Sequence, residues 1–138
     1  MSNDPIALIR RWFEEVWNQR REEVIDEMLS DESVCHADDG PIRGPQEFKE
    51  RQYAPFIAAF PDLRLEVEAT LGEGDQVVAR WVAIGRHTGD GLGFQATHET
   101  ATLRGITWVR IREGKMIEGW QHSNIPEVIR QLAAKALP

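Results

Sequence analysis

The sequence has little cysteine, few basic residues and no long hydrophobic run. Its 138 residues include one cysteine, Cys35, which excludes an intrachain disulfide and a zinc site built from several cysteines. Asp and Glu number 23 against 16 Lys and Arg, so the net charge of -7 argues against nucleic acid and anionic membrane surfaces as partners. No apolar stretch approaches the roughly 20 residues of a membrane span, and the first residues do not resemble a signal peptide. We therefore expect a cytoplasmic protein, with Cys35 packed in its interior.

The composition is that of a globular protein, with 41% hydrophobic and 28% charged residues. This length predicts a single domain over residues 1–138. Apolar residues recur at helical spacing over 6–17, directly after Asp4 and Pro5, which suit the start of a helix. Further helices are expected after Asn18, from about residue 44 with a break or kink at Pro55, and from about residue 124.

The hydrophobic period changes to two in the second half of the chain. Apolar and polar residues alternate from Leu63 to Thr70, which predicts a half-buried strand. Further strands are expected over about 33–37, 76–87, 98–112 and 115–122, and the glycine-containing segment 88–97 is predicted to be a mobile loop. Tight turns between successive strands predict an α+β fold, in which an antiparallel sheet carries the helices on one face and leaves a cavity between the layers.

Several short motifs occur in an order that resembles the SnoaL-like polyketide cyclase (ester cyclase) family. They lie at 60–64 (FPDLR), 80–81 (RW), 85–89 (GRHTG), 104–106 (RGI) and 113–120 (EGKMIEGW), with His36 and a later Gly-Pro pair upstream. Each motif is weak alone, but the ordered set covers about residues 5–135.

This resemblance implies a cone-shaped fold like that of nuclear transport factor 2, with a curved antiparallel sheet wrapped by N-terminal helices. It also implies a homodimer formed through the sheet, no metal and no cofactor. Founding members of the family close a ring by intramolecular aldol condensation of a polyketide ester. The expected partner is a small apolar or carbonyl-containing ligand.

The resemblance also marks a departure at the catalytic position. In the cyclases an aspartate follows the hairpin tryptophan directly, whereas Gln121 follows Trp120 here. A histidine on the neighbouring strand supports that aspartate, and Thr107 takes its place in this sequence. A glutamine amide cannot accept a proton at neutral pH, although it can donate a hydrogen bond to an oxyanion.

Other residues can supply the acid or base that proton abstraction requires. By strand alternation His87 shares a face with Trp81 and is expected at the cavity mouth, or else it is a strand-end histidine bonded to the loop. His36 either lines the cavity floor or is a satisfied core histidine. Asp38 or Asp39 stands where ketosteroid isomerases of the same superfamily carry a base, although Asp-Asp-Gly-Pro is also ordinary turn chemistry.

We therefore predict proton transfer at carbon, in a cyclisation or isomerisation of an apolar carbonyl compound. The alternative is a domain of the same fold that binds a small molecule without turnover. Epoxide hydrolysis is a third interpretation, but the strand faces do not assemble the Asp–Arg–Asp set that it needs. The predicted site comprises His36, Asp39 and His87 as acid or base, Gln121 as oxyanion donor, and Trp81, Thr107 and Trp120 as substrate contacts; the histidines show no metal-binding spacing.

Overall fold

The computed structural model describes residues 4–136. In chain order the elements are α1 (Pro5–Arg11), the π-helix η1 (Trp12–Asn18), α2 (Glu23–Met28), β1 (Val34–Ala37), β2 (Gly40–Arg43), α3 (Gly44–Phe48), the π-helix η2 (Lys49–Tyr53), α4 (Ala54–Ala59), β3 (Arg64–Glu73), β4 (Gln76–Arg86), β5 (Thr100–Arg112), β6 (Lys115–Ser123) and α5 (Ile125–Ala136). No helix among these residues is long and apolar enough to cross a membrane.

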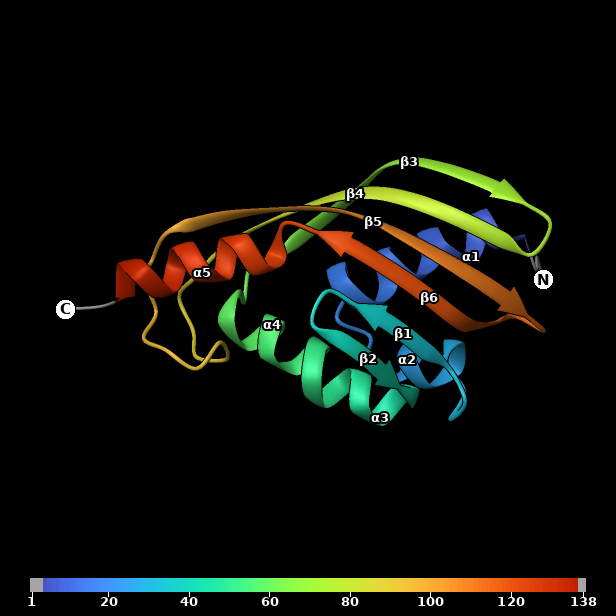
Figure 1. The fold of residues 1–138 in the computed structure, drawn as a ribbon, viewed down its shortest axis with the longest axis horizontal. Coiled ribbons are helices and arrows are strands. Elements are labelled where there is room, and N and C mark those ends of the chain that lie inside the picture. Colours follow the sequence, from blue (N-terminus) through green and yellow to red (C-terminus); the bar gives the residue numbers. More distant parts are fainter. Residues whose placement is uncertain (1–3, 137–138) are drawn as a thin grey trace.

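The strands form one six-stranded sheet in the order β2-β1-β6-β5-β4-β3. Figure 1 shows the long strands β3–β6 curving over the helices, and the β1–β2 hairpin at one end of the sheet. The predicted α+β fold with a curved sheet and helices is therefore confirmed.

The sheet departs from the sequence prediction in two places. β1 pairs with β6 in parallel, whereas the other pairs are antiparallel. Antiparallel pairing was predicted from tight turns between successive strands. β1 and β6 are not successive, so no tight turn sets the direction of their pairing. The segment after β1, which begins with the turn-like Asp-Asp-Gly-Pro, pairs as β2, and Pro41 is tolerated there because β2 is an edge strand.

The N-terminal helix starts as predicted. The Asp4 side chain accepts a hydrogen bond from the Ile6 N–H at 3.1 Å, and Pro5 occupies the first turn. At Pro55 the expected break is milder: the rod α3–η2–α4 continues, but it takes a π-helical path over Lys49–Tyr53 just before the proline. Pro55 falls in the first turn of α4, where its missing N–H matters least.

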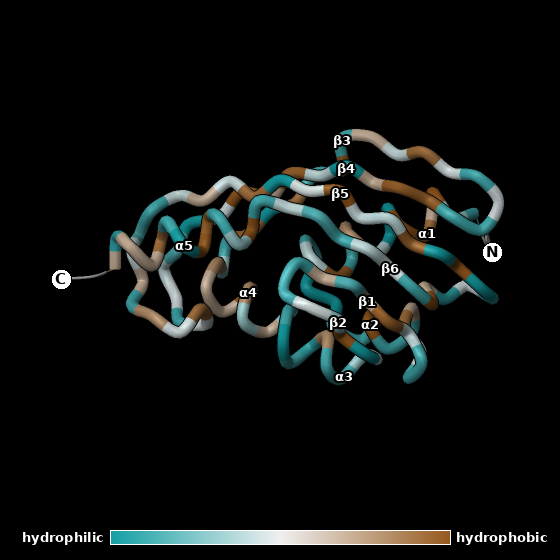
Figure 2. The backbone as a smooth tube through the Cα atoms, in the orientation of Figure 1, coloured by the Kyte–Doolittle hydropathy of each residue, from teal (hydrophilic) through white to brown (hydrophobic). Residues whose placement is uncertain are grey.

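The core lies between the helices and one face of the sheet. Alternate residues of β4 and β5, such as Val77, Ala79, Leu103 and Val109, are buried on this inner face. Figure 2 shows the matching alternation of hydrophobic and hydrophilic residues along the strands. We call the opposite side of the sheet the outer face.

The segment 88–97, predicted to be mobile, packs against α4. The N–H groups of Thr88 and Gly89 donate to the Ala59 carbonyl at 3.2 Å. A Cβ atom on Gly89 would lie only 2.0 Å from the Ala58 carbonyl oxygen, so the backbone of this segment fits closely onto the helix.

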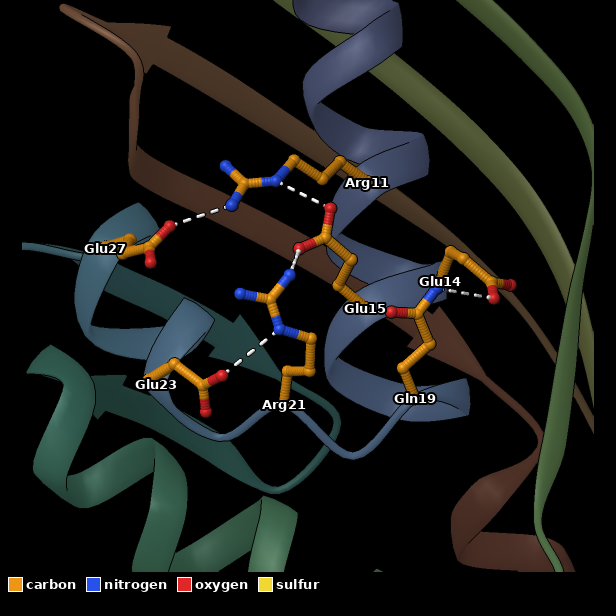
Figure 3. A network of polar contacts seen from close by, with 7 residues as sticks. All are labelled: Arg11, Glu14, Glu15, Gln19, Arg21, Glu23 and Glu27. Carbon is orange, nitrogen blue, oxygen red and sulfur yellow. Dashed lines mark hydrogen bonds and ion pairs between the residues drawn. The ribbon is translucent and has the colours of Figure 1, made fainter.

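An ion-pair network joins the first helices on the surface (Figure 3). Arg11 bonds both Glu15, at 2.7 Å, and Glu27, at 2.8 Å, and Arg21 links Glu15 to Glu23. Exposed pairs of this kind contribute only about 0–1 kcal/mol each. They connect α1, η1 and α2 at the surface.

Candidate ligand cavity

A cavity of about 80 Å³ lies between the helices and the inner face of the sheet. This volume is roughly half of the ~150 Å³ that holds benzene in an apolar protein cavity. A small molecule, or one end of a larger one, therefore fits if the walls adjust. Most of the lining is apolar or aromatic, and its polar residues, besides three tryptophans, are Ser33, Cys35, Gln52, Thr107, Glu118 and Gln121.

Trp81 reaches over β5 to contact Thr107. Its indole N–H donates to Thr107 Oγ1 at 2.9 Å, and both residues are buried. Gly105 makes this possible, because a Cβ there would lie 2.5 Å from the Trp81 ring. Since Thr107 Oγ1 accepts from Trp81, its own O–H remains to donate.

Gln121 lies directly opposite Thr107 on β6, and both residues line the cavity. Facing residues on paired strands hold their Cβ atoms about 4.5–5.5 Å apart. The Gln121 amide and the Thr107 hydroxyl therefore form one corner with two hydrogen-bond donors. A carbonyl oxygen is the group that such a corner suits.

Asp38 adds a carboxylate beside this corner, from the turn between β1 and β2. Its Oδ2 accepts from Gln121 Nε2 at 3.4 Å, and its Oδ1 accepts from the Ser123 backbone N–H at 3.0 Å. The Ser123 hydroxyl donates to Oδ2 at 2.5 Å. Asp38 is exposed, so these contacts fix an ionisable group at the solvent side of Gln121.

The described residues that line the cavity include two of ionisable type, Cys35 and Glu118, but strand alternation turns the Glu118 side chain to the outer face, on the same side as Trp120. Burial raises the pKa of the Cys35 thiol to about 11, which keeps it protonated at neutral pH. The Glu118 carboxylate is bonded to Arg110 at 2.9 Å and to His36 at 2.8 Å. Cys35 is therefore the ionisable side chain that the described lining residues turn towards the cavity.

His36 and Trp120 lie on the outer face instead of the cavity side. They are partners in the parallel pairing of β1 with β6, and their rings stack at 5.6 Å. Trp120 also contacts Trp108 on β5. Because side chains alternate along a strand, the inward position of Gln121 sends its neighbour Trp120 outward.

His87 is fully buried next to the cavity layer, but it does not line the cavity. Its ring packs between Phe60 and Phe94, and its Nδ1 accepts from the Thr97 N–H at 3.2 Å. Its Nε2 is buried without a hydrogen-bond partner in the described part of the chain. Burial, together with the nearby His98, lowers the pKa of His87, so the neutral form is favoured.

The model of the SnoaL-like polyketide cyclase family matches residues 7–132. The chain belongs to this family. A search of curated proteins finds no significant match.

Solved structures of similar fold carry more than one functional description. A candidate SnoaL-like cyclase from Jannaschia sp. CCS1 shares 21% identity over 97% of this chain and 93% of its own, with a TM-score of 0.83. AclR, a candidate hydroxylase from Streptomyces galilaeus, shares 26% identity over 98% of this chain and 87% of its own, with a TM-score of 0.81. A candidate polyketide cyclase from Acidithiobacillus ferrooxidans shares 26% identity over 99% and 100%, with a TM-score of 0.79. The fold of SnoaL-like proteins therefore does not choose the reaction.

Within this SnoaL-like chain, the structure brings together part of the predicted site. Trp81, Thr107 and Gln121 line the cavity, whereas Asp39 is exposed in the β1–β2 turn and does not. The sequence analysis did not identify Gln52. Its four-residue spacing from Phe48 and Phe56 would have placed it on the same helix face as these two aromatic residues. Within residues 4–136, no three His, Cys, Asp or Glu side chains gather where they could hold a metal ion.

Proposed function

We propose that this protein binds a small, mostly apolar carbonyl compound and transfers a proton at the carbon next to the carbonyl. The observation that carries the proposal is the donor corner formed by Thr107 and Gln121 in a cavity whose lining is mostly apolar. Two preorganised donors in a site with little water stabilise the negative oxygen that develops when the neighbouring carbon loses a proton.

Asp38 is the group that we assign as the base. Its carboxylate does not line the cavity, but it contacts Gln121 from the solvent side, beside the corner that would hold the carbonyl. In the proposed step Asp38 accepts the proton from carbon, and the enolate oxygen accepts hydrogen bonds from Gln121 and Thr107. Asp38 then returns the proton to another carbon in an isomerisation, or to the new alkoxide after the enolate carbon attacks a second carbonyl in a cyclisation.

Exchange of carbon-bound protons in D₂O tests this function. Loss of the proton signals of 1,3-dicarbonyl esters and cyclic ketones would be followed by NMR, with and without the protein. We expect Asp38→Asn to lower catalysed exchange by ~10²–10⁴-fold, the usual contribution of a general base. Asp39→Asn is the matched control, because it removes a neighbouring carboxylate that does not contact Gln121. Equal exchange by both variants would contradict the role of Asp38.

A second candidate function is binding without turnover. It is favoured by one observation: among the described lining residues the Cys35 thiol stays protonated at neutral pH, and the Glu118 carboxylate is bonded to Arg110 and His36 on the outer face. Under this alternative the donor corner holds the ligand and Asp38 serves only to orient Gln121. Saturable binding of a ketone with no proton exchange, in wild type and Asp38→Asn alike, would favour it.

We also propose a homodimer formed through the outer face of the sheet. Large apolar side chains are exposed there, including Ile106 at 46% and Trp108 at 47%. Sedimentation at micromolar concentration should show a dimer, and Ile106→Glu should shift it towards monomer. Gln95→Glu, an equal charge change in an exposed loop, is the control. A wild-type monomer under these conditions would contradict the proposal.

We also propose that the protein acts in the cytoplasm. Cys35 is an unpaired thiol, and oxidising compartments favour disulfide-bonded cysteines. Fractionation of the cells that naturally make the protein, followed by immunoblotting, should find it in the cytoplasmic fraction. Recovery from the secreted fraction would contradict this assignment.

A further inference from the structure

The rod α3–η2–α4 presents a stripe of side chains to the cavity. Phe48, Gln52 and Phe56 recur every four residues, and all three line the cavity. Residues at this spacing share one face of a helix. Gln52 is the polar member of an otherwise aromatic stripe.

The Gln52 amide has no hydrogen-bond partner among residues 4–136, in contrast to the exposed Gln46 of the same rod, which donates to Glu50 at 2.7 Å. Gln52 is half-buried, so the cavity wall takes part of its hydration away. Because this amide is not fully enclosed, it stays open to a hydrogen bond with a molecule in the cavity. An amide offers both a donor and an acceptor, and a ligand oxygen can use either.

Gln52 and Gln121 reach the cavity from different layers. Gln52 comes from the helical rod, whereas Gln121 belongs to β6 of the sheet that the rod faces across the cavity. Figure 1 shows the rod below β6. Between these two amides the lining is largely apolar, so a ligand that satisfies both carries an oxygen at each end of a short hydrocarbon skeleton.

We propose that Gln52 is a specificity-determining residue that selects ligands with a second oxygen group, a carbonyl or a hydroxyl, separate from the carbonyl held by Thr107 and Gln121. This inference rests on the proposed binding of a carbonyl compound. Gln52 lies in the π-helical segment η2, and such segments occur often at functional sites. The substrate class is therefore a carbonyl compound with a second oxygen group; 1,3-dicarbonyls and β-hydroxy ketones are two such compounds.

Three compounds with one carbon skeleton separate the possibilities. Pentane-2,4-dione has two carbonyls, 4-hydroxypentan-2-one replaces one by a hydroxyl, and pentan-2-one lacks the second oxygen. Their affinities would be measured by NMR titration of ¹⁵N-labelled protein, for wild type and Gln52→Met. Methionine keeps the length and bulk of the side chain but removes both hydrogen-bonding groups. Gln46→Met is the matched control on the exposed side of the rod.

We expect wild type to bind at least one of the two-oxygen compounds roughly fivefold or more tightly than pentan-2-one, the effect of about one net hydrogen bond. Gln52→Met should remove that preference and leave the affinity for pentan-2-one unchanged, whereas Gln46→Met should keep the preference. The preferred two-oxygen compound identifies the second group as carbonyl or hydroxyl.

The outcomes keep the two proposals apart. If wild type binds all three compounds equally, or if Gln52→Met keeps the preference, the role of Gln52 is overturned while carbonyl binding stands. If no compound shifts the resonances of Thr107 and Gln121, the proposed function itself fails, and the inference fails with it. Should Gln52→Met not fold, Gln52→Asn, which shortens the reach of the amide, is expected to weaken the same preference.

Discussion

Trp81 and Trp108 come from neighbouring strands of the same sheet, yet they meet opposite surroundings. Trp81 is 4% exposed on the inner face and bonds Thr107 inside the cavity wall, whereas Trp108 is 47% exposed on the outer face and bonds Gln76 at the surface. The inner face carries apolar walls and a few neutral donors. The outer face carries charges, histidine and exposed aromatics. The alternation of the strands thus separates a ligand-binding surface from a surface suited to a partner.

Truncating the two tryptophans gives the largest expected contrast. Trp81→Ala should lower the free energy of unfolding by about 3–5 kcal/mol, because it leaves a cavity in a packed wall. Trp108→Ala should cost about 1 kcal/mol or less at concentrations where the protein is monomeric, as expected for a largely exposed site. Urea unfolding monitored by circular dichroism would measure both. Equal losses would show that the two faces are not energetically distinct.

Gly105 allows the comparison to be sharpened without removing a large side chain. Gly105→Ala places a methyl group where the Trp81 ring lies, so we expect a loss of about 1–3 kcal/mol from overpacking. The displaced indole should also lose its hydrogen bond to Thr107, which would shift the Trp81 indole N–H resonance. Gly74→Ala is the comparison variant: no atom lies within 4 Å of its added Cβ, although its positive φ adds some strain. An unshifted indole resonance would contradict this account.

Strand alternation predicted much of this arrangement from the sequence. It placed Trp81 on the cavity side, and Thr107 and Gln121 lie opposite each other on that side once β5 and β6 pair. The same rule excludes Trp120 from the cavity, because it immediately precedes Gln121. Predicting both neighbours as cavity residues was inconsistent with a regular strand.

Other parts of the site depend on pairings that no local pattern reveals. The register of β1 against β6 turns His36 towards Trp120 and brings Asp38 to Gln121, yet these strands are far apart in the sequence. His87 shares the inward side of β4, but its position at the end of the strand puts it between Phe60 and Phe94. Tertiary packing fixes such details, and hydrophobic periodicity carries no information about them.

The buried His87 should make stability depend on pH. Its pKa is lowered in the folded state by burial, so the unfolded chain binds the proton more readily. The stabilisation from the neutral ring is fully present above about pH 6.5, the ordinary pKa of histidine, and is lost as the pH falls towards the folded-state pKa.

Urea unfolding at several pH values between about 7 and 5 tests this dependence. His87→Phe keeps an aromatic ring between Phe60 and Phe94 but cannot titrate, so its stability should vary less with pH than that of wild type. His98 and Asp90, the charged groups that act on His87, are the same in both proteins. The exposed His122→Gln should keep the wild-type dependence, and a parallel pH profile for His87→Phe would contradict the assignment.

The smallest effect is expected for the charges of the outer face. Glu68 lies 3.4 Å from Arg80 and 3.9 Å from Arg104, and both arginine side chains are more than half exposed. Glu68→Gln should therefore change the free energy of unfolding of the monomer by less than about 1 kcal/mol, since water and salt screen such pairs. Unfolding at low and at high salt would measure it, and the small difference should shrink further as salt rises. A loss comparable to that of Trp81→Ala would mean that the charges of the outer face stabilise the fold. The two faces would then not differ in their contribution to stability.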